Sequence, residues 1–169
     1  NIGLVHEAVG NYPSALEFQA RALSAMEALS DRAGVARTLG NIGNVHYSLG
    51  DYPRALEYQN RALKMRDALG DRSGASQTLG NLGNIHFELG DFARALGFQE
   101  RALKLKEELG DRVGVAQTLG NIGLVYQSLG NFPSALDYQQ RAMKLKEEVG
   151  DRVGVAGTLG NIGNVYYAI

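Results

Sequence analysis

Three histidines, His6, His46 and His86, follow one another at intervals of forty residues and are the first side chains that could do chemistry. Three imidazoles can form a zinc site, in which each His–metal bond is about 2 Å long. The interval places each histidine on a different copy of a repeated helix, and packed helices lie about 8 to 10 Å apart. Imidazoles so separated cannot bind one ion. We therefore predict that they pack in the apolar core and form no metal site.

Other catalytic arrangements are missing from the sequence. There is no cysteine, and no Ser-His-Asp order can be assembled when the histidines belong to a packing stripe. The glycines from Gly154 to Gly163 do not follow a predicted strand, as those of a phosphate-binding loop would. The mixed charge run from Lys104 to Glu108, which includes Lys106, is typical of a solvated helix face. We expect no enzymatic activity and no cofactor.

A row of asparagines is the strongest candidate for binding. Asn occupies the position of Asn41 in all five copies of the repeat, and at about 100° per residue Asn41 and Asn44 share an arc opposite the apolar stripe. Asn is a poorer helix former than Glu, Lys or Gln, so a merely solvated face would favour those residues. An amide donates and accepts at once, which suits the backbone of an extended peptide. The row indicates a peptide-binding groove.

A structural use of the same amides is the alternative. The asparagines would then form a ladder that orients the helices of adjacent repeats. Glutamines recur in the same way on the inner face of the second helix, and a buried amide must find partners or cost a few kcal/mol. We predict that these glutamines are structural and bond to a neighbouring His or Tyr or to the backbone. They are Gln19, Gln59, Gln99 and Gln139.

The elements that position these residues follow from the period. The phrase that runs from Thr38 to Gly50 returns forty residues later three times, which is the mark of a repeat array. Apolar residues at helical spacing predict helices over 32–49 and 52–69, with Leu49 and Leu69 on their inner stripes. Asp or Asn caps each start and Gly follows most ends. Period-two alternation is absent, so strands are not expected.

The residue pattern resembles the tetratricopeptide repeat over essentially the whole chain. The matching positions are Leu39, Ile42, Gly43, His46, Leu49, Gly50, Ala55, Ala62 and Leu63. Small residues at Gly43, Ala55 and Ala62 let two helices approach closely. The period of forty, against thirty-four in the family, and Gln59 in place of an aromatic are departures. The longer unit is similar to repeats of the Pins/LGN class of G-protein signalling adaptors and of bacterial signalling proteins.

The resemblance implies an all-α fold, a solenoid of antiparallel helix pairs wound as a right-handed tetratricopeptide superhelix. First helices of such domains line the concave face, where the Asn41 and Asn44 positions bind ligand. Arg37 matches a basic position of the adaptor class, Gln77 and Gln117 depart from it, and Leu124 offers an apolar contact. The peptide-binding residues so implied are Arg37, Asn41, Asn44, Gln77, Asn81, Asn84, Gln117, Asn121, Leu124, Asn161 and Asn164.

We expect residues 1–169 to form a single array, with repeats at about 1–30, 31–70, 71–110 and 111–150 and a terminal half-repeat at 151–169. Both ends fall inside a repeat, so the chain is expected to be an excerpt. Unfinished ends predict weak end-to-end self-association through Ile2, Val5, Ile162 and Val165. The expected function is a non-enzymatic scaffold that binds an extended peptide or partner segment in the concave groove.

The charge balance narrows the partners. With 17 basic and 18 acidic side chains the net charge is −1, so we expect neither nucleic acid nor membrane as a partner. No apolar run is long enough to span a bilayer, and the cytoplasm is the default location. Two alternatives remain: a structural or self-associating arm of a larger signalling protein, and a helical repeat that reads RNA bases with amides, which would need a basic field.

Overall fold

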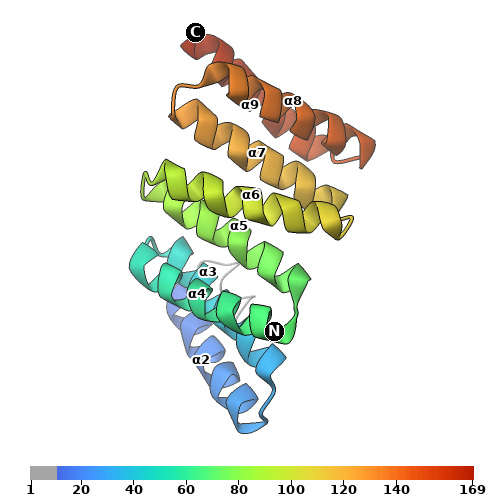
Figure 1. The fold of residues 1–169 in the computed structure, drawn as a ribbon. Coiled ribbons are helices and arrows are strands. Elements are labelled where there is room, and N and C mark those ends of the chain that lie inside the picture. The colour runs from blue at the N-terminus through green and yellow to red at the C-terminus, as the bar shows by residue number, and fades with distance from the viewer. Residues whose placement is uncertain (1–10) are drawn as a thin grey trace. The chain divides into compact units, whose positions relative to one another are not determined.

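The computed structural model describes residues 11–169, and this range is entirely helical apart from short turns. Figure 1 shows the helices in chain order. They are α2 (Tyr12–Ala28), α3 (Arg32–Ser48), α4 (Tyr52–Leu69), α5 (Arg72–Glu88), α6 (Phe92–Glu108), α7 (Arg112–Ser128), α8 (Phe132–Glu148) and α9 (Arg152–Ala168). The predicted all-α solenoid is confirmed, and the predicted ends of α3 and α4 are correct to within one residue.

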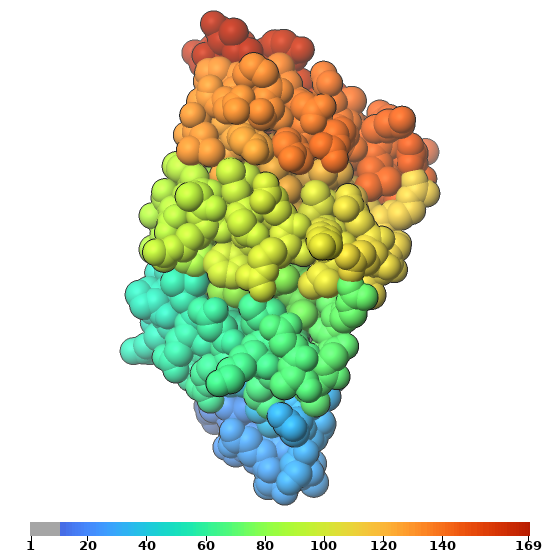
Figure 2. Space-filling view, in the orientation of Figure 1, coloured from blue at the N-terminus to red at the C-terminus, as the bar shows by residue number. Residues whose placement is uncertain are grey.

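The chain divides into two compact units, residues 1–85 (unit 1) and residues 86–169 (unit 2), with the division near the end of α5. Within unit 1, α3 packs against α2 and α4, and within unit 2, α7 packs against α6 and α8. The space-filling view shows side chains filling the gaps that the ribbon leaves between neighbouring helices of each unit (Figure 2). The single array over 1–169 stays a prediction, as do statements about His6, Ile2 and Val5, which lie outside the described residues.

The helix ends follow the capping pattern of the sequence. The carboxylate of Asp31 accepts a hydrogen bond from the backbone N–H of Gly34 at 2.9 Å, and Asp111 caps Gly114 at the same distance. Each satisfies one of the backbone donors that a helix start leaves unpaired. Six of the turns contain a glycine with φ between 68° and 77°. At the α2–α3 turn the corresponding residue is Ser30, whose φ of 55° is in the left-handed region.

Close helix pairing rests on the small residues that the sequence indicated. A Cβ at Gly43 would lie 2.9 to 3.1 Å from the side chain of Gln59, closer than packed carbons tolerate. Ala55 and Ala62 are fully buried beside it. Gln59 is itself fully buried, and its Nε2 donates to the carbonyl of Gly40 at 3.1 Å. Gln139 makes the same bond to Gly120 at 3.1 Å, so the structural, backbone-bonded role is confirmed for Gln59 and Gln139. Gln19 is equally buried, but no hydrogen bond of its amide is seen within residues 11–169.

Three details of the packing differ from the sequence predictions. Leu49 and Leu69 are 46% and 40% exposed, because they stand at helix ends where the chain turns away from the core. Val165 is fully buried and Ile162 half-buried, so they do not form an exposed end face. Lys106 is only 8% exposed, because it reaches into the turn that follows its helix instead of lying on a solvated face.

Candidate functional site

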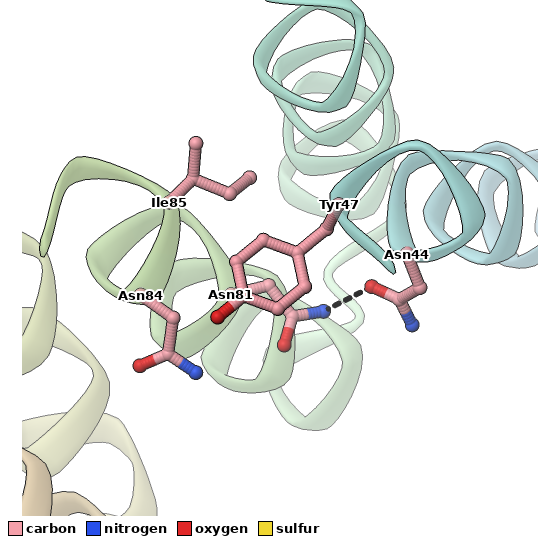
Figure 3. A pocket seen from close by; sticks show the side chains of 5 residues that line it. All are labelled: Asn44, Tyr47, Asn81, Asn84 and Ile85. Atoms are coloured by element: carbon pink, nitrogen blue, oxygen red, sulfur yellow. Dashed lines mark hydrogen bonds between the residues drawn. The ribbon is translucent and has the colours of Figure 1, made fainter. Parts of the chain in front are cut away.

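A small pocket in unit 1 brings together asparagines from two successive first helices. Its lining consists of Asn44 and Tyr47 from α3 and Asn81, Asn84 and Ile85 from α5, which we call the asparagine surface (Figure 3). The pocket holds about 30 Å³. That is room for a single small group such as a water. The asparagine surface is therefore a notch for one backbone group or one small side-chain end, not a cavity for a whole ligand.

Asn44 is the centre of the hydrogen bonding at this notch. Its Oδ1 accepts from Nε2 of Gln59 at 2.7 Å and from Nδ2 of Asn81 at 3.0 Å. One acceptor thus joins α3 to α4 of its own repeat and to α5 of the next. The bond between Asn44 and Asn81 is the contact that an inter-repeat ladder requires. The sequence placed both residues in the row but did not indicate the bond to Gln59.

The bond leaves one polar atom of each amide for other partners. Neither Nδ2 of Asn44 nor Oδ1 of Asn81 bonds to another residue within 11–169, and Figure 3 shows both atoms on the same side of the bond that joins the two side chains. The pair therefore presents one donor and one acceptor on the same side. In an extended chain the N–H and C=O of one residue point to the same edge and supply the complementary donor and acceptor.

The other residues predicted to bind ligand lie on α3, α5, α7 and α9 and do not line the notch. Arg37 and Gln77 are exposed near the starts of α3 and α5, and Asn41 is half-buried. Asn44 is more buried than a position opposite the apolar stripe suggested, because Asn81 on α5, the first helix of the next repeat, lies beside it. In unit 2, Gln117 is exposed, Asn121 and Leu124 are half-buried on α7, and on α9 Asn161 is half-buried and Asn164 exposed.

Two residues of the asparagine surface, Tyr47 and Ile85, were not singled out from the sequence. The ring of Tyr47 lies across the notch in Figure 3 and also contacts Tyr52, with ring centroids 5.9 Å apart. In unit 2, Phe87 and Phe92 form the same kind of pair at 5.6 Å. An aromatic residue follows the histidine position in three copies, as Tyr47, Phe87 and Tyr167, whereas Glu7 and Gln127 stand there in the other two, so the sequence carried only a partial signal.

The histidines are packing residues, as predicted. The imidazole of His46 stacks on Tyr58 with centroids 5.4 Å apart, and His86 stacks on Phe98 at 5.3 Å. Both are buried. Burial lowers the pKa of His86, an effect that Asp91 opposes and Arg94 reinforces. In the part of the chain that the structure describes, no three His, Asp or Glu side chains are grouped so that they could hold a metal ion.

Two buried cations and one half-buried cation, which the sequence analysis missed, connect three second helices to the next helix. Nη1 of Arg66 donates to the carbonyl of Gly74 and to Oγ1 of Thr78, each at 2.5 Å. Nζ of Lys106 makes the corresponding contacts to Gly114 at 3.5 Å and Thr118 at 2.8 Å. Burial lowers the pKa of both cations, against the attraction of Asp71 and Asp111. Lys146 repeats the arrangement between α8 and α9.

Comparison with known proteins places the chain in a family. The tetratricopeptide repeat model matches residues 1–68, 57–108, 74–148 and 114–169, so the chain belongs to the tetratricopeptide repeat family. A search of curated proteins gave no match. Folds of this family support protein–protein interaction. Within residues 11–169, no helix combines the length and the apolar character needed to cross a bilayer.

Solved structures share the fold at low sequence identity. BtubC (BKLC) from P. vanneervenii is 22% identical with a TM-score of 0.88, over 98% of this chain and 69% of that one. A Rap protein complexed with competence and sporulation factor is 19% identical with a TM-score of 0.84, over 97% of this chain and 46% of that one. Aspartyl phosphate phosphatase F from Bacillus subtilis is 16% identical with a TM-score of 0.88, over 93% and 41%. This chain thus spans less than half of the latter two proteins.

Proposed function

We propose that the protein is a non-enzymatic interaction scaffold whose asparagine surface binds an extended segment of a partner protein. The observation that carries the proposal is the adjacent donor and acceptor that Asn44 and Asn81 present beside their mutual hydrogen bond. Both amides are half-buried and held in place, Asn44 by Gln59 and Asn81 by Asn44. Fixed polar groups lose little rotamer freedom when a ligand arrives, which favours affinity.

The surroundings of the notch suit a peptide. Tyr47 supplies an apolar wall beside the amides, which meet the backbone irrespective of ligand sequence. Arg37 lies seven residues before Asn44, about 10 Å along α3, where it can attract a carboxylate of the same segment. In unit 2, Asn121, Asn161 and Asn164 stand at the repeat positions of the row, and Leu124 offers an apolar contact there.

Related proteins are compatible with this role. The Rap protein complexed with competence and sporulation factor shows that a similar array occurs in a protein with a bound factor. Aspartyl phosphate phosphatase F has a similar fold over part of its length, so the fold alone does not separate scaffolds from enzymes. The non-enzymatic part of the proposal rests on the chemistry of the asparagine surface, where amides, a phenol and an alkyl group offer no nucleophile with an adjacent base.

The test uses peptides selected by phage display against the wild-type chain. Changing Asn81 and Asn121 together to Ala should weaken binding of a selected peptide by on the order of 10- to 1000-fold, because each lost amide leaves a desolvated backbone group unsatisfied at about 1 to 3 kcal/mol. Calorimetric titration measures the affinity. The matched control is Asn60→Ala on the exposed face of α4, which should bind like wild type. Full-strength binding by the double variant would reject the proposal.

The ladder hypothesis predicts a different result for the same variants. The observation that supports this hypothesis is the hydrogen bond between Asn44 and Asn81. If the row only orients helices, Asn81→Ala lowers the melting temperature. Any loss of affinity is then no larger than the unfolded fraction of the protein accounts for. Thermal melts and titrations on the same protein separate the two functions.

A self-associating arm is the second candidate function. It is favoured by the exposed apolar side chains of α9, among which Val153 is 85% and Tyr166 61% exposed. Ideal monomer behaviour in sedimentation equilibrium at high concentration would exclude it. Loss of association in Val153→Asp would support it, because the substitution places a charge in the contact.

A further inference from the structure

A larger groove lies in unit 1 between the second helices α2 and α4, with α3 as its floor. Its volume is about 570 Å³, within the range of about 300 to 1,000 Å³ that ligand pockets have. We call it the basic groove. It is lined by Glu27, Ser30, Arg32, Val35, Leu39, Arg61, Lys64 and Met65.

The basic groove and the asparagine surface lie on opposite sides of α3. At about 100° per residue, Val35 and Asn44 are separated by about 180° around the helix axis. Val35 and Leu39 point toward the basic groove, where Leu23, Met26 and Met65 pack against them. The two surfaces can therefore be changed independently.

The rim of the basic groove carries an excess of positive charge. Three lining residues are cationic, Arg32, Arg61 and Lys64, and one is acidic, Glu27. Within residues 11–169, Arg32 and Lys64 form no ion pair. Arg61 has an exposed ion pair with Glu57 at 3.6 Å and lies over the ring of Tyr58, with its Cζ 5.4 Å from the ring centroid. Exposed ion pairs of that kind contribute little. The floor is apolar, so a partner must bring both negative charge and an apolar side chain.

In unit 2, the arginine at the repeat position of Arg32 is paired with a carboxylate. Arg112, at the position of Arg32, donates a short hydrogen bond to the carboxylate of Glu148 on α8. The residue at the position of Glu148 in α4 is Ala68. Arg32 therefore lacks the counter-ion that its repeat equivalent has, and this difference is confined to one residue of the second helix.

We propose that the basic groove docks an acidic amphipathic segment of a partner protein. A bulky apolar side chain of that segment enters between Val35, Leu39 and Met65. Carboxylates on either side of it pair with Arg32 and Lys64, in the place that Glu148 occupies for Arg112. None of the lining residues is aromatic, so the groove offers no stacking platform of the kind that single-stranded nucleic acid needs.

The experiment uses a fluorescein-labelled synthetic peptide, Glu-Glu-Leu-Glu-Phe-Leu-Glu-Glu, titrated against the whole chain by fluorescence anisotropy. Wild type should bind it saturably, with an affinity that falls as salt is added. Lys64→Glu should weaken binding about five- to tenfold, because it replaces attraction by repulsion. Ala68→Glu, which recreates the pairing of Glu148, should weaken binding about three- to fivefold by occupying Arg32.

Matched controls make the result specific to this groove. Lys144→Glu makes the same charge change at the equivalent position of α8 and should leave the affinity unchanged. A peptide with Ser in place of Leu and Phe should not bind. Equal binding by wild type, Lys64→Glu and Ala68→Glu would overturn the proposal. A second result would also overturn it: the wild type binds a single-stranded RNA oligonucleotide but not the peptide, and Lys64→Glu abolishes the RNA binding.

Discussion

The turn between α2 and α3 and the turn between α6 and α7 join equivalent helices by different means. At the later turn, Lys106 lies over Gly114 and donates to Thr118, and Gly110 adopts a φ of 69°. At the earlier turn, Met26 lies over Gly34, Thr38 bonds only to the carbonyl of Gly34, and Ser30 adopts the positive φ. The two turns follow the same backbone path. The later one is stabilised by a buried cation and a glycine, and the earlier one has a thioether and a strained serine at the same positions.

The comparison teaches that the threonine has a different energetic role in the two turns. The hydroxyl of Thr118 is the nearer of two acceptors for the buried ammonium of Lys106. The hydroxyl of Thr38 only donates its own hydrogen bond, to the carbonyl of Gly34. Leaving a buried charged donor with a poor partner costs more than removing a neutral hydroxyl.

The largest expected effect comes from Thr118→Val. It should lower the free energy of unfolding by about 2 to 3 kcal/mol, since Lys106 keeps only a carbonyl at 3.5 Å. Thr38→Val, the matched change at the earlier turn, should cost about 1 kcal/mol or less. Urea unfolding followed by circular dichroism measures both. Adding Lys106→Met, the residue type of the earlier turn, should restore most of the loss in Thr118→Val, and equal losses at the two threonines would show that the cation does not matter.

A smaller effect is expected from the serine of the earlier turn. Ser30→Gly should stabilise unit 1 by about 1 kcal/mol, because a residue with a Cβ pays about that cost in the left-handed region. The reciprocal change Gly110→Ser should destabilise by a similar amount. A thermal melt detects both, and a lowered melting temperature for Ser30→Gly would mean that the serine side chain contributes to the turn.

The smallest expected effect concerns pH and distinguishes two packing residues of unit 2. Burial lowers the pKa of His86, so its contribution to stability is complete above about pH 6.5 and is lost as the pH falls through the lowered pKa. Tyr126 occupies the same position one repeat later and stacks on Tyr138. Between pH 7.5 and 5.5, the melting temperature of His86→Tyr should therefore fall less than that of the wild type. Parallel pH profiles for the two proteins would contradict this.

Periodic features of the fold could be predicted because each copy of the repeat supplies the same information. Apolar spacing and capping residues located α3 and α4, and small residues at Gly43 and Ala62 located their contact. Contacts across a turn were harder to predict. Lys106 stands in a run of charged residues, and only the folded turn brings it to Thr118, twelve residues later.

The candidate site could be predicted in outline only. The recurrence of Asn41 and Asn44 indicated the side of the first helix on which the small pocket lies. The sequence did not reveal that Asn44 would accept from Gln59, because that bond depends on the close approach that Gly43 permits. It also did not reveal Tyr47 as a wall of the notch, since an aromatic residue near a helix end has several possible directions.

Under the proposed function, the shared acceptor on Asn44 would make peptide affinity sensitive to mechanical strain within unit 1. Its Oδ1 holds Asn81 of the next repeat, and the same two amides supply the donor and acceptor proposed for a peptide. Any force that changes the angle between α3 and α5 separates these groups and so alters affinity. By thermodynamic reciprocity, a bound peptide resists that change of angle with the same coupling energy. A segment bound in the notch would contact both repeats and would reduce their relative motion at that point.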